Sequence, residues 1–224
     1  MKKKIFAFIF ARKNSKRVKN KNIRKINNIE LINYTFNLAK KIKLIDKIFV
    51  STDSKKIIDL AKKKKINYIL RPKKLCTSGS SEILSWKHSI KFLEKKGEKF
   101  DYFLSLPSTS PLRNQVDIMN LIKNFSTFKS DLAITVTKTN RIPYFNMVKI
   151  NKDGFVKIAE KKKNYSKKNL FDITTVGYIS TPEYILKSKN IFKGKVRSIL
   201  VPRERALDID DEYDLKLAKL LLKK

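Results

Sequence analysis

The chain alternates short apolar runs with segments of helical periodicity over nearly its whole length. Residues 5–10 are continuously apolar, as in a strand buried on both faces, and residues 31–42 carry apolar side chains at helical spacing. Further strands are expected at 47–50, 66–70, 102–106, 132–136, 173–179 and 197–201, and further helices at 54–61, 80–93, 116–125 and 212–222. This alternation predicts one three-layer α/β domain over residues 1–224, with a mostly parallel sheet.

One segment interrupts this alternation. Residues 148–150 and 155–158 are short β-prone runs on either side of Asn151-Lys152-Asp153-Gly154, a favourable hairpin turn. We expect a β-hairpin that projects from the core within residues 140–170. Because a projecting hairpin commonly reaches a partner subunit, this segment is also a candidate dimerisation element.

Polar residues follow the predicted strands directly. In open α/β sheets ligands bind at the carboxyl ends of the strands, where such residues converge. The loop after the first strand reads Ala11-Arg12-Lys13-Asn14-Ser15-Lys16-Arg17, with Lys21-Asn22 close behind. Its cations, hydroxyl and backbone N–H groups can bind phosphate, although a solvated basic loop would have a similar composition.

These residues and four later motifs resemble the acylneuraminate cytidylyltransferases (CMP-sialic acid synthetases), including relatives that handle legionaminic- and pseudaminic-type sugars. The matching motifs, in chain order, are Ala11-Arg12 with Ser15-Lys16 and Lys21-Asn22, then Val50-Ser51-Thr52-Asp53, Arg71-Pro72, Ser110-Pro111-Leu112-Arg113 and Asp208-Ile209-Asp210. Each motif alone is weak, but their order and spacing over nearly the whole chain are specific. The resemblance implies a Rossmann-like nucleotidyltransferase fold and a typically dimeric enzyme.

The resemblance also implies a reaction. The anomeric hydroxyl of an acidic, sialic-acid-like sugar attacks the α-phosphorus of CTP, and pyrophosphate leaves, so the enzyme must neutralise charge and align the groups. The implied nucleotide-binding residues are Arg12, Ser15, Lys16, Lys21, Asn22, Arg71 and Ser81, with Arg12, Lys21 and Asp210 catalytic. For Arg71 and Ser81, an ordinary turn and a helix cap are alternative interpretations.

Asp208 and Asp210 are the candidate metal ligands. They alternate along a stretch that we expect to be extended, so both carboxylates should point to one face. Hard oxygen ligands suit Mg²⁺, which also takes phosphate oxygens and would stabilise the leaving pyrophosphate. The alternative is that this acidic run simply caps the following helix and matches its dipole.

The sugar site departs most from the family pattern. Relatives carry Asn-Gly-Ala-Ile-Tyr-Ile late in the sheet, where this chain has Thr174-Thr175-Val176-Gly177-Tyr178-Ile179. The resemblance therefore assigns Thr174 and Tyr178 to the sugar, and Asn146, in a segment similar to legionaminic-type relatives, is a further candidate. No general base is evident, since His88 is expected to lie within a helix in a structural role.

Charge and cysteine content limit the classes of protein to which this chain could belong. The chain has 53 Lys and Arg against 20 Asp and Glu, a net charge of +33, yet its lysines are spread along the whole length rather than clustered for nucleic acid. A single cysteine excludes an internal disulfide, and no apolar stretch is long enough to span a membrane, so a cytoplasmic protein is expected. A cytidylyltransferase for Kdo or another acid sugar, a non-catalytic family member and a basic nucleic-acid-binding protein remain alternatives.

Overall fold

The computed structural model describes residues 2–15, 17–77, 79–160 and 169–222. Its centre is a seven-stranded sheet in the order β11-β7-β10-β6-β1-β4-β5. The strands are β1 (Ile5–Phe10), β4 (Lys47–Thr52), β5 (Asn67–Leu70), β6 (Tyr102–Ser105), β7 (Leu132–Lys138), β10 (Phe171–Ser180) and β11 (Val196–Leu200). Only β10 runs antiparallel to its neighbours β6 and β7, which confirms the expected mostly parallel sheet.

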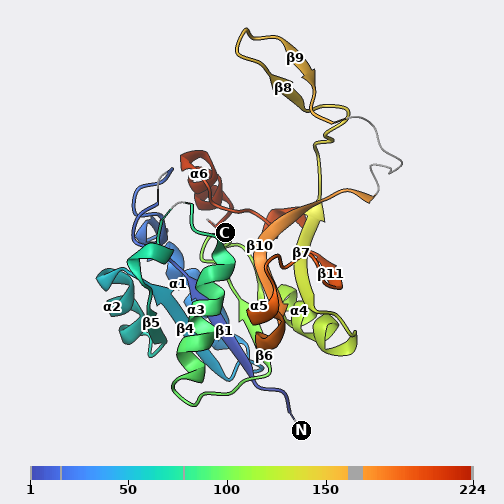
Figure 1. Cartoon of the computed structure of the whole chain (residues 1–224). Helices are drawn as coiled ribbons and strands as arrows, with labels where there is room; N and C mark the ends of the chain where they lie inside the picture. Colours follow the sequence, from blue (N-terminus) through green and yellow to red (C-terminus); the bar gives the residue numbers. More distant parts are fainter. Residues whose placement is uncertain (1, 16, 78, 161–168, 223–224) are drawn as a thin grey trace.

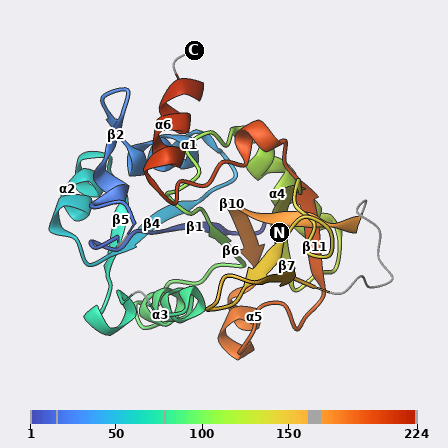
Figure 2. The ribbon, with the colours of Figure 1, turned by 90° about the horizontal axis from the view of Figure 1, so that it is seen from above.

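Helices cover both faces of the sheet, which gives the expected three layers (Figures 1 and 2). The helices are α1 (Leu31–Lys41), α2 (Lys55–Lys63), α3 (Glu82–Glu94), α4 (Gln115–Thr127), α5 (Pro182–Lys187) and α6 (Glu212–Leu221). Strand β1 shows why two layers form. Ile5, Ala7 and Ile9 pack in one core with α1, α2 and α4, whereas Phe6 and Phe8 pack in a second core with α3 and α5.

A smaller unit packs a segment that follows β1 against the C-terminal helix α6. The two-residue strands β2 (Lys25–Ile26) and β3 (Ile29–Glu30) form a ribbon whose turn residues Asn27 and Asn28 have positive φ angles of 49° and 63°. Ile26 and Leu31 pack against Ile209 and Leu215, so α6 lies over this ribbon. The ribbon is not among the elements expected from the sequence, because strands of two residues carry no periodic signal.

The predicted hairpin is present and projects from the body of the molecule (Figure 1). It consists of β8 (Val148–Ile150) and β9 (Val156–Ile158), paired antiparallel, and the Asn151 side chain accepts the N–H groups of Asp153 and Phe155 in its turn. Gly154 has a φ of +87°, a conformation that favours glycine. Part of the 140–170 segment, residues 161–168, lies outside the described residues.

Strand β10 contains a bulge between Ile173 and Tyr178, where its register with β7 shifts. Gly177 lies in this bulge at a close approach to α4. A β-carbon there would come within 2.9 Å of the Leu121 side chain and 3.2 Å of Ile118. The bulge therefore requires glycine for space, and it carries the neighbouring threonines to the carboxyl edge of β6.

Candidate functional site

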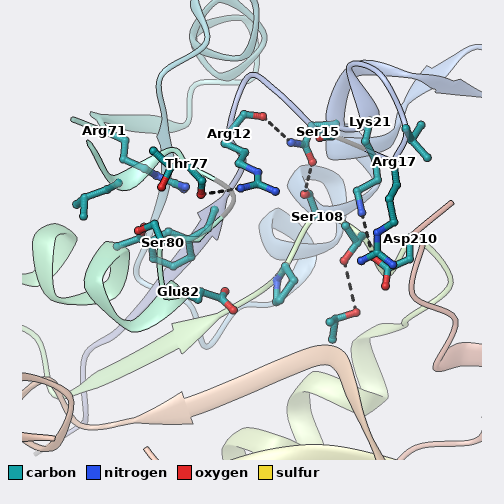
Figure 3. Close-up of a pocket in the computed structure, with 18 residues that line it drawn as sticks. Arg12, Ser15, Arg17, Lys21, Arg71, Thr77, Ser80, Glu82, Ser108 and Asp210 are labelled. Atoms are coloured by element: carbon teal, nitrogen blue, oxygen red, sulfur yellow. Dashed lines mark hydrogen bonds and ion pairs between the residues drawn. The ribbon is translucent and has the colours of Figure 1, made fainter. Parts of the chain in front are cut away.

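A cavity of about 530 Å³ lies at the carboxyl ends of β1 and β6 (Figure 3). Its walls come from the loop after β1, the short helix at Lys21–Ile23, the segment from β5 into α3, the loop after β6, the β10 bulge and the chain just before α6. The lining includes Arg12, Ser15, Arg17, Lys21, Asn22, Arg71, Ser80, Glu82, Ser108, Thr109, Thr175 and Asp210. The structure thus brings six of the expected site residues to one cavity: Arg12, Ser15, Lys21, Asn22, Arg71 and Asp210.

Hydrogen bonds hold the basic loop in place. The buried Asn22 amide donates to the Arg12 carbonyl at 3.0 Å and accepts from the Ser108 hydroxyl at 2.7 Å. Arg12 in turn donates to the carbonyl of Thr77 at 2.8 Å. Asn22 therefore positions the loop through its own side chain, and its predicted contact with cytosine or ribose stays a prediction. Lys16 lies outside the described residues.

Two cations meet Asp210 in one corner of the cavity. Lys21 Nζ lies 3.4 Å from Asp210 Oδ1 and donates to the Ile209 carbonyl at 2.5 Å, while Arg17 Nη2 lies 3.1 Å from the same carboxylate oxygen. Arg17 belongs to the basic loop after β1 but is not among the site residues expected from the sequence. The arrangement places two positive charges and one carboxylate where a polyphosphate could bind.

Asp208 lies beside this corner, next to Thr109 and Thr175. Burial raises the pKa of its carboxyl group, a hydrogen bond from Thr109 opposes that rise, and the charge of Asp210 adds to it. Its Oδ1 is buried without a hydrogen-bond partner. Within the described residues no three His, Cys, Asp or Glu side chains are grouped to hold a metal. Mg²⁺ nevertheless often binds through one or two carboxylates plus substrate phosphates, which the orphaned Asp208 oxygen beside Asp210 fits.

Arg71 closes the opposite wall. Its buried guanidinium donates to Ser51 Oγ at 3.2 Å and to the Ser51 carbonyl at 2.6 Å, and it stacks 5.4 Å from the centre of the Phe10 ring. Burial lowers the pKa of Arg71. The side chain is thus a fixed positive charge with one planar face against an aromatic ring.

A second cavity, of about 400 Å³, adjoins the first and shares Glu82 with it. It is lined by Ser81, Glu82, Ile83, Trp86, Ile173, Tyr178, Lys189, Asn190, Ile191 and Phe192. Ser81 immediately precedes α3 but makes no capping hydrogen bond with its side chain. The Tyr178 and Trp86 rings lie 5.7 Å apart, and burial raises the pKa of Tyr178. Ser81, expected at the nucleotide, and Tyr178, expected at the sugar, therefore both line the second cavity and not the first.

The other two residues assigned to the sugar line neither cavity. Thr174 is buried in the bulge, where its hydroxyl donates to Thr135 Oγ1 at 2.7 Å, and its neighbour Thr175 faces the first cavity instead. Asn146 is exposed at the base of the hairpin, where its Oδ1 accepts the N–H of Ile142 at 2.5 Å. Sugar binding by these two residues stays a prediction.

Arg113 fixes the floor of the site from beneath. Its fully buried guanidinium donates to the carbonyls of Thr175 (3.3 Å) and Val176 (2.7 Å), to the hydroxyl of Thr35 and to the carbonyl of Pro107. Burial lowers its pKa to about 9, which leaves it charged at neutral pH. One side chain thus joins the loop after β6, the β10 bulge and α1.

Because Lys21 is predicted to donate to the reacting phosphates, its replacement by alanine is expected to lower kcat/KM about 10²-fold. Steady-state pyrophosphate release measures the effect. Lys19→Ala, in the same loop but exposed, is the matched control and should change little. If both variants had the same kinetics, the predicted catalytic role of Lys21 would be rejected.

Comparison with known proteins agrees with the geometry. The family described as cytidylyltransferase matches residues 6–179. Post-translational flagellin modification protein B of Campylobacter coli is 31% identical over 98% of this chain and 95% of its own length. CMP-N,N'-diacetyllegionaminic acid synthase of Campylobacter jejuni is 30% identical over 97% of this chain and 94% of its own length.

A solved structure confirms the fold. The CMP:2-keto-3-deoxy-manno-octonic acid synthetase complexed with CTP superposes with a TM-score of 0.72 over 98% of each chain, at 13% identity. The expected three-layer nucleotidyltransferase fold is therefore correct. None of the helices in the described ranges is long and apolar enough to cross a membrane.

Proposed function

Because this chain belongs to the cytidylyltransferase family, we propose that it transfers CMP from CTP to an acidic sugar that carries acylamino groups, with release of pyrophosphate. The observation that carries the proposal is the joined pair of cavities. One is lined with fixed cations suited to a nucleoside triphosphate, and the other combines aromatic and aliphatic side chains with Lys189. Glu82 lies where the two cavities meet.

The first cavity supports the nucleotide part of the proposal. Lys21 and Arg17 would neutralise the β- and γ-phosphates, and Arg12 would contact the α-phosphate region from the loop after β1. Stabilisation of the charge that moves onto pyrophosphate is the main task of such a site. Ser15, Asn22 and Arg71 would hold the rest of the nucleotide, each from a segment that hydrogen bonds or packing already fix.

Magnesium is the cofactor that we propose for this corner. Asp208 and Asp210 would hold it. The buried Asp208 Oδ1, which has no hydrogen-bond partner, would then coordinate the ion. When bound, Mg²⁺ supplies positive charge that favours departure of pyrophosphate. Lys21 and Arg17 would then turn from Asp210 toward the phosphates, because the phosphates carry more negative charge.

The second cavity supports an acylated sugar as acceptor. The N-acyl methyl group of such a sugar is apolar, and the rings of Trp86, Tyr178 and Phe192 offer it a matching wall. Lys189 at the same wall would pair with the sugar carboxylate. An acid sugar such as Kdo has no acylamino group, only hydroxyls in its place, and would leave this apolar wall unused. The name of the C. jejuni relative, which contains a diacetylated sugar, points the same way.

The hairpin is proposed as the dimer contact. The hairpin and its base expose apolar side chains that the other described residues leave uncovered, among them Phe145, Ile150, Phe155 and Val156. Exposed apolar patches of this kind mark interaction surfaces. A homodimer would cover them, and light scattering of the full chain measures its mass; a monomer at all concentrations would reject this use of the hairpin.

The experiment that tests the function is pyrophosphate release from CTP and Mg²⁺ with N,N'-diacetyllegionaminate, N-acetylneuraminate, pseudaminate and Kdo. We expect turnover with at least one acylated sugar and a lower kcat/KM for Kdo. Turnover with Kdo alone would overturn the acyl assignment and keep the reaction class. CTP binding without turnover of any sugar, or no CTP binding, would favour a non-catalytic member of the family.

A further inference from the structure

The attack of a sugar hydroxyl on phosphorus releases a proton, and a carboxylate near the attacking oxygen can accept it. In the described part of the chain, Glu82 and Asp210 are the carboxylates that line the first cavity. His88, the only histidine of the sequence, lines neither cavity. We propose that Glu82 accepts the proton of the attacking hydroxyl, an inference that rests on the proposed function and adds a base to it.

Position favours Glu82 over Asp210. Glu82 is the first residue of α3 and lines both cavities, so a sugar in the second cavity and a nucleotide in the first would meet beside it. Figure 3 shows its carboxylate pointing into the first cavity, apart from the corner that holds Lys21, Arg17 and Asp210. Asp210 lies in that corner, where the leaving pyrophosphate is expected.

Basicity also favours Glu82. Asp210 is paired with two cations, Arg17 and Lys21, so its carboxylate is already engaged on the far side of the cavity. Glu82 instead accepts one neutral hydrogen bond, from Trp86 Nε1 at 3.2 Å. The Glu82 side chain is itself exposed, and the protein around the cavity raises its pKa; the Trp86 bond and the charge of Arg71 from the end of β5 oppose that rise, and the charge of Asp208 adds to it. A carboxylate with a raised pKa is the better proton acceptor.

Proton and electron pair move together in the proposed step. A Glu82 carboxylate oxygen takes the proton of the anomeric hydroxyl as the hydroxyl oxygen forms a bond to the α-phosphorus of CTP. The bond from the α-phosphorus to the bridging oxygen of the β-phosphate breaks, and pyrophosphate leaves with the electron pair. The resulting Glu82 carboxylic acid returns its proton to water when the products leave.

A purely structural role is the competing explanation. An acidic residue in the first turn of α3 favourably meets the positive end of the helix dipole, and the Trp86 bond could be its whole purpose. Glu82→Gln separates the two. Glutamine keeps the length of the side chain and can still accept the Trp86 hydrogen bond through Oε1, but it cannot take a proton.

The test compares wild type, Glu82→Gln and Glu82→Ala with the acylated sugar that the panel identifies. We expect Glu82→Gln to lower kcat about 10²-fold, with CTP affinity by calorimetry and the melting temperature unchanged. Added formate should raise kcat of Glu82→Ala severalfold, because a small carboxylate can replace the missing base. Glu94→Gln, exposed at the other end of α3, is the matched control and should match wild type.

The outcomes separate this proposal from the proposed function. Wild-type turnover together with a Glu82→Gln kcat equal to wild type would overturn the role of Glu82 and leave the function intact. A kcat lost in Glu82→Gln but not restored by formate in Glu82→Ala, with weaker CTP binding, would assign Glu82 to structure and also overturn the proposal. Absence of wild-type turnover with every sugar would overturn both.

Discussion

Replacement of Asp210 by alanine should reduce kcat/KM by about 10³-fold or more at saturating Mg²⁺, with little change in the melting temperature. The reason is that a proposed ligand of Mg²⁺ is lost, so the ion would no longer be held where it offsets the charge of the departing pyrophosphate. The fold should survive, because the Asp210 side chain is partly exposed and its backbone N–H keeps the hydrogen bond to Asp214. Pyrophosphate release as a function of Mg²⁺ concentration measures the change.

A matched variant guards this result against a general effect of removing acid from a basic protein. Asp59→Ala, on the exposed side of α2, removes the same group far from the cavity and should leave kcat/KM unchanged. Mg²⁺ concentrations above those that saturate the wild type should restore part of the activity of Asp210→Ala if Asp208 still binds the ion. Wild-type kinetics in Asp210→Ala would reject the metal assignment altogether.

Replacement of Arg113 by methionine should destabilise the protein by about 4 kcal/mol, the second large effect that we expect. Methionine fills similar space, but the acceptors on Thr35, Pro107, Thr175 and Val176 would lose their donor in the interior, at about 1–3 kcal/mol for each that water cannot reach. For a chain of this size, such a loss lowers the melting temperature by about 10 °C. Calorimetry or circular dichroism measures the shift.

The control for Arg113 is a cation on the outside of the same region. Lys123→Met, exposed on α4, should shift the melting temperature by no more than about 2 °C. Arg113→Lys should stay clearly less stable than wild type, because one ammonium group cannot reach all four acceptors. A melting temperature of Arg113→Met within that same margin of wild type would contradict the structural role of Arg113.

The basic loop and the acidic pair could be predicted because each is a compact motif next to a strand. Arg12, Ser15 and Lys21 follow β1 within a few residues, and the fold brings the end of any parallel strand to one edge. Asp208 and Asp210 carry their own spacing. Position along the chain was thus enough to place Arg12, Ser15, Lys21 and Asp210 in one cavity, with Asp208 buried beside it.

The bulge in β10 shows why the sugar site could not be predicted as well. Alternation along a regular strand gives each residue a face, but here five steps along β10, from Ile173 to Tyr178, pair with only two along β7, so the alternation breaks. Thr174 is consequently buried against Thr135, and Thr175 faces the cavity. Among the local residues only Gly177 indicates the bulge. A larger residue there would contact Leu121 of α4, which lies far away in the sequence.

The places of Glu82 and Arg113 in the site could not be predicted from the sequence for a related reason. The role of each depends on partners far along the chain: Tyr178 and Lys189 share a cavity with Glu82, and Thr175 accepts from Arg113. A sequence pattern gives the residue type but not these contacts between residues far apart in the chain. A glutamate at a helix start and an arginine after a Ser-Pro-Leu run are each common in ordinary turns and caps.

The pairing of the β2–β3 ribbon with α6 has a consequence for the order of folding. Lys21 meets Asp210 across 189 residues of chain, and Arg24 meets Glu212 across 188. Closing such large loops costs more entropy than forming the local strand–helix units, so the sheet can assemble before this contact exists. We therefore expect the cation half and the carboxylate half of the cavity to come together after the sheet has formed. Any ligand that bridges both halves will hold α6 down and protect its amide hydrogens from exchange.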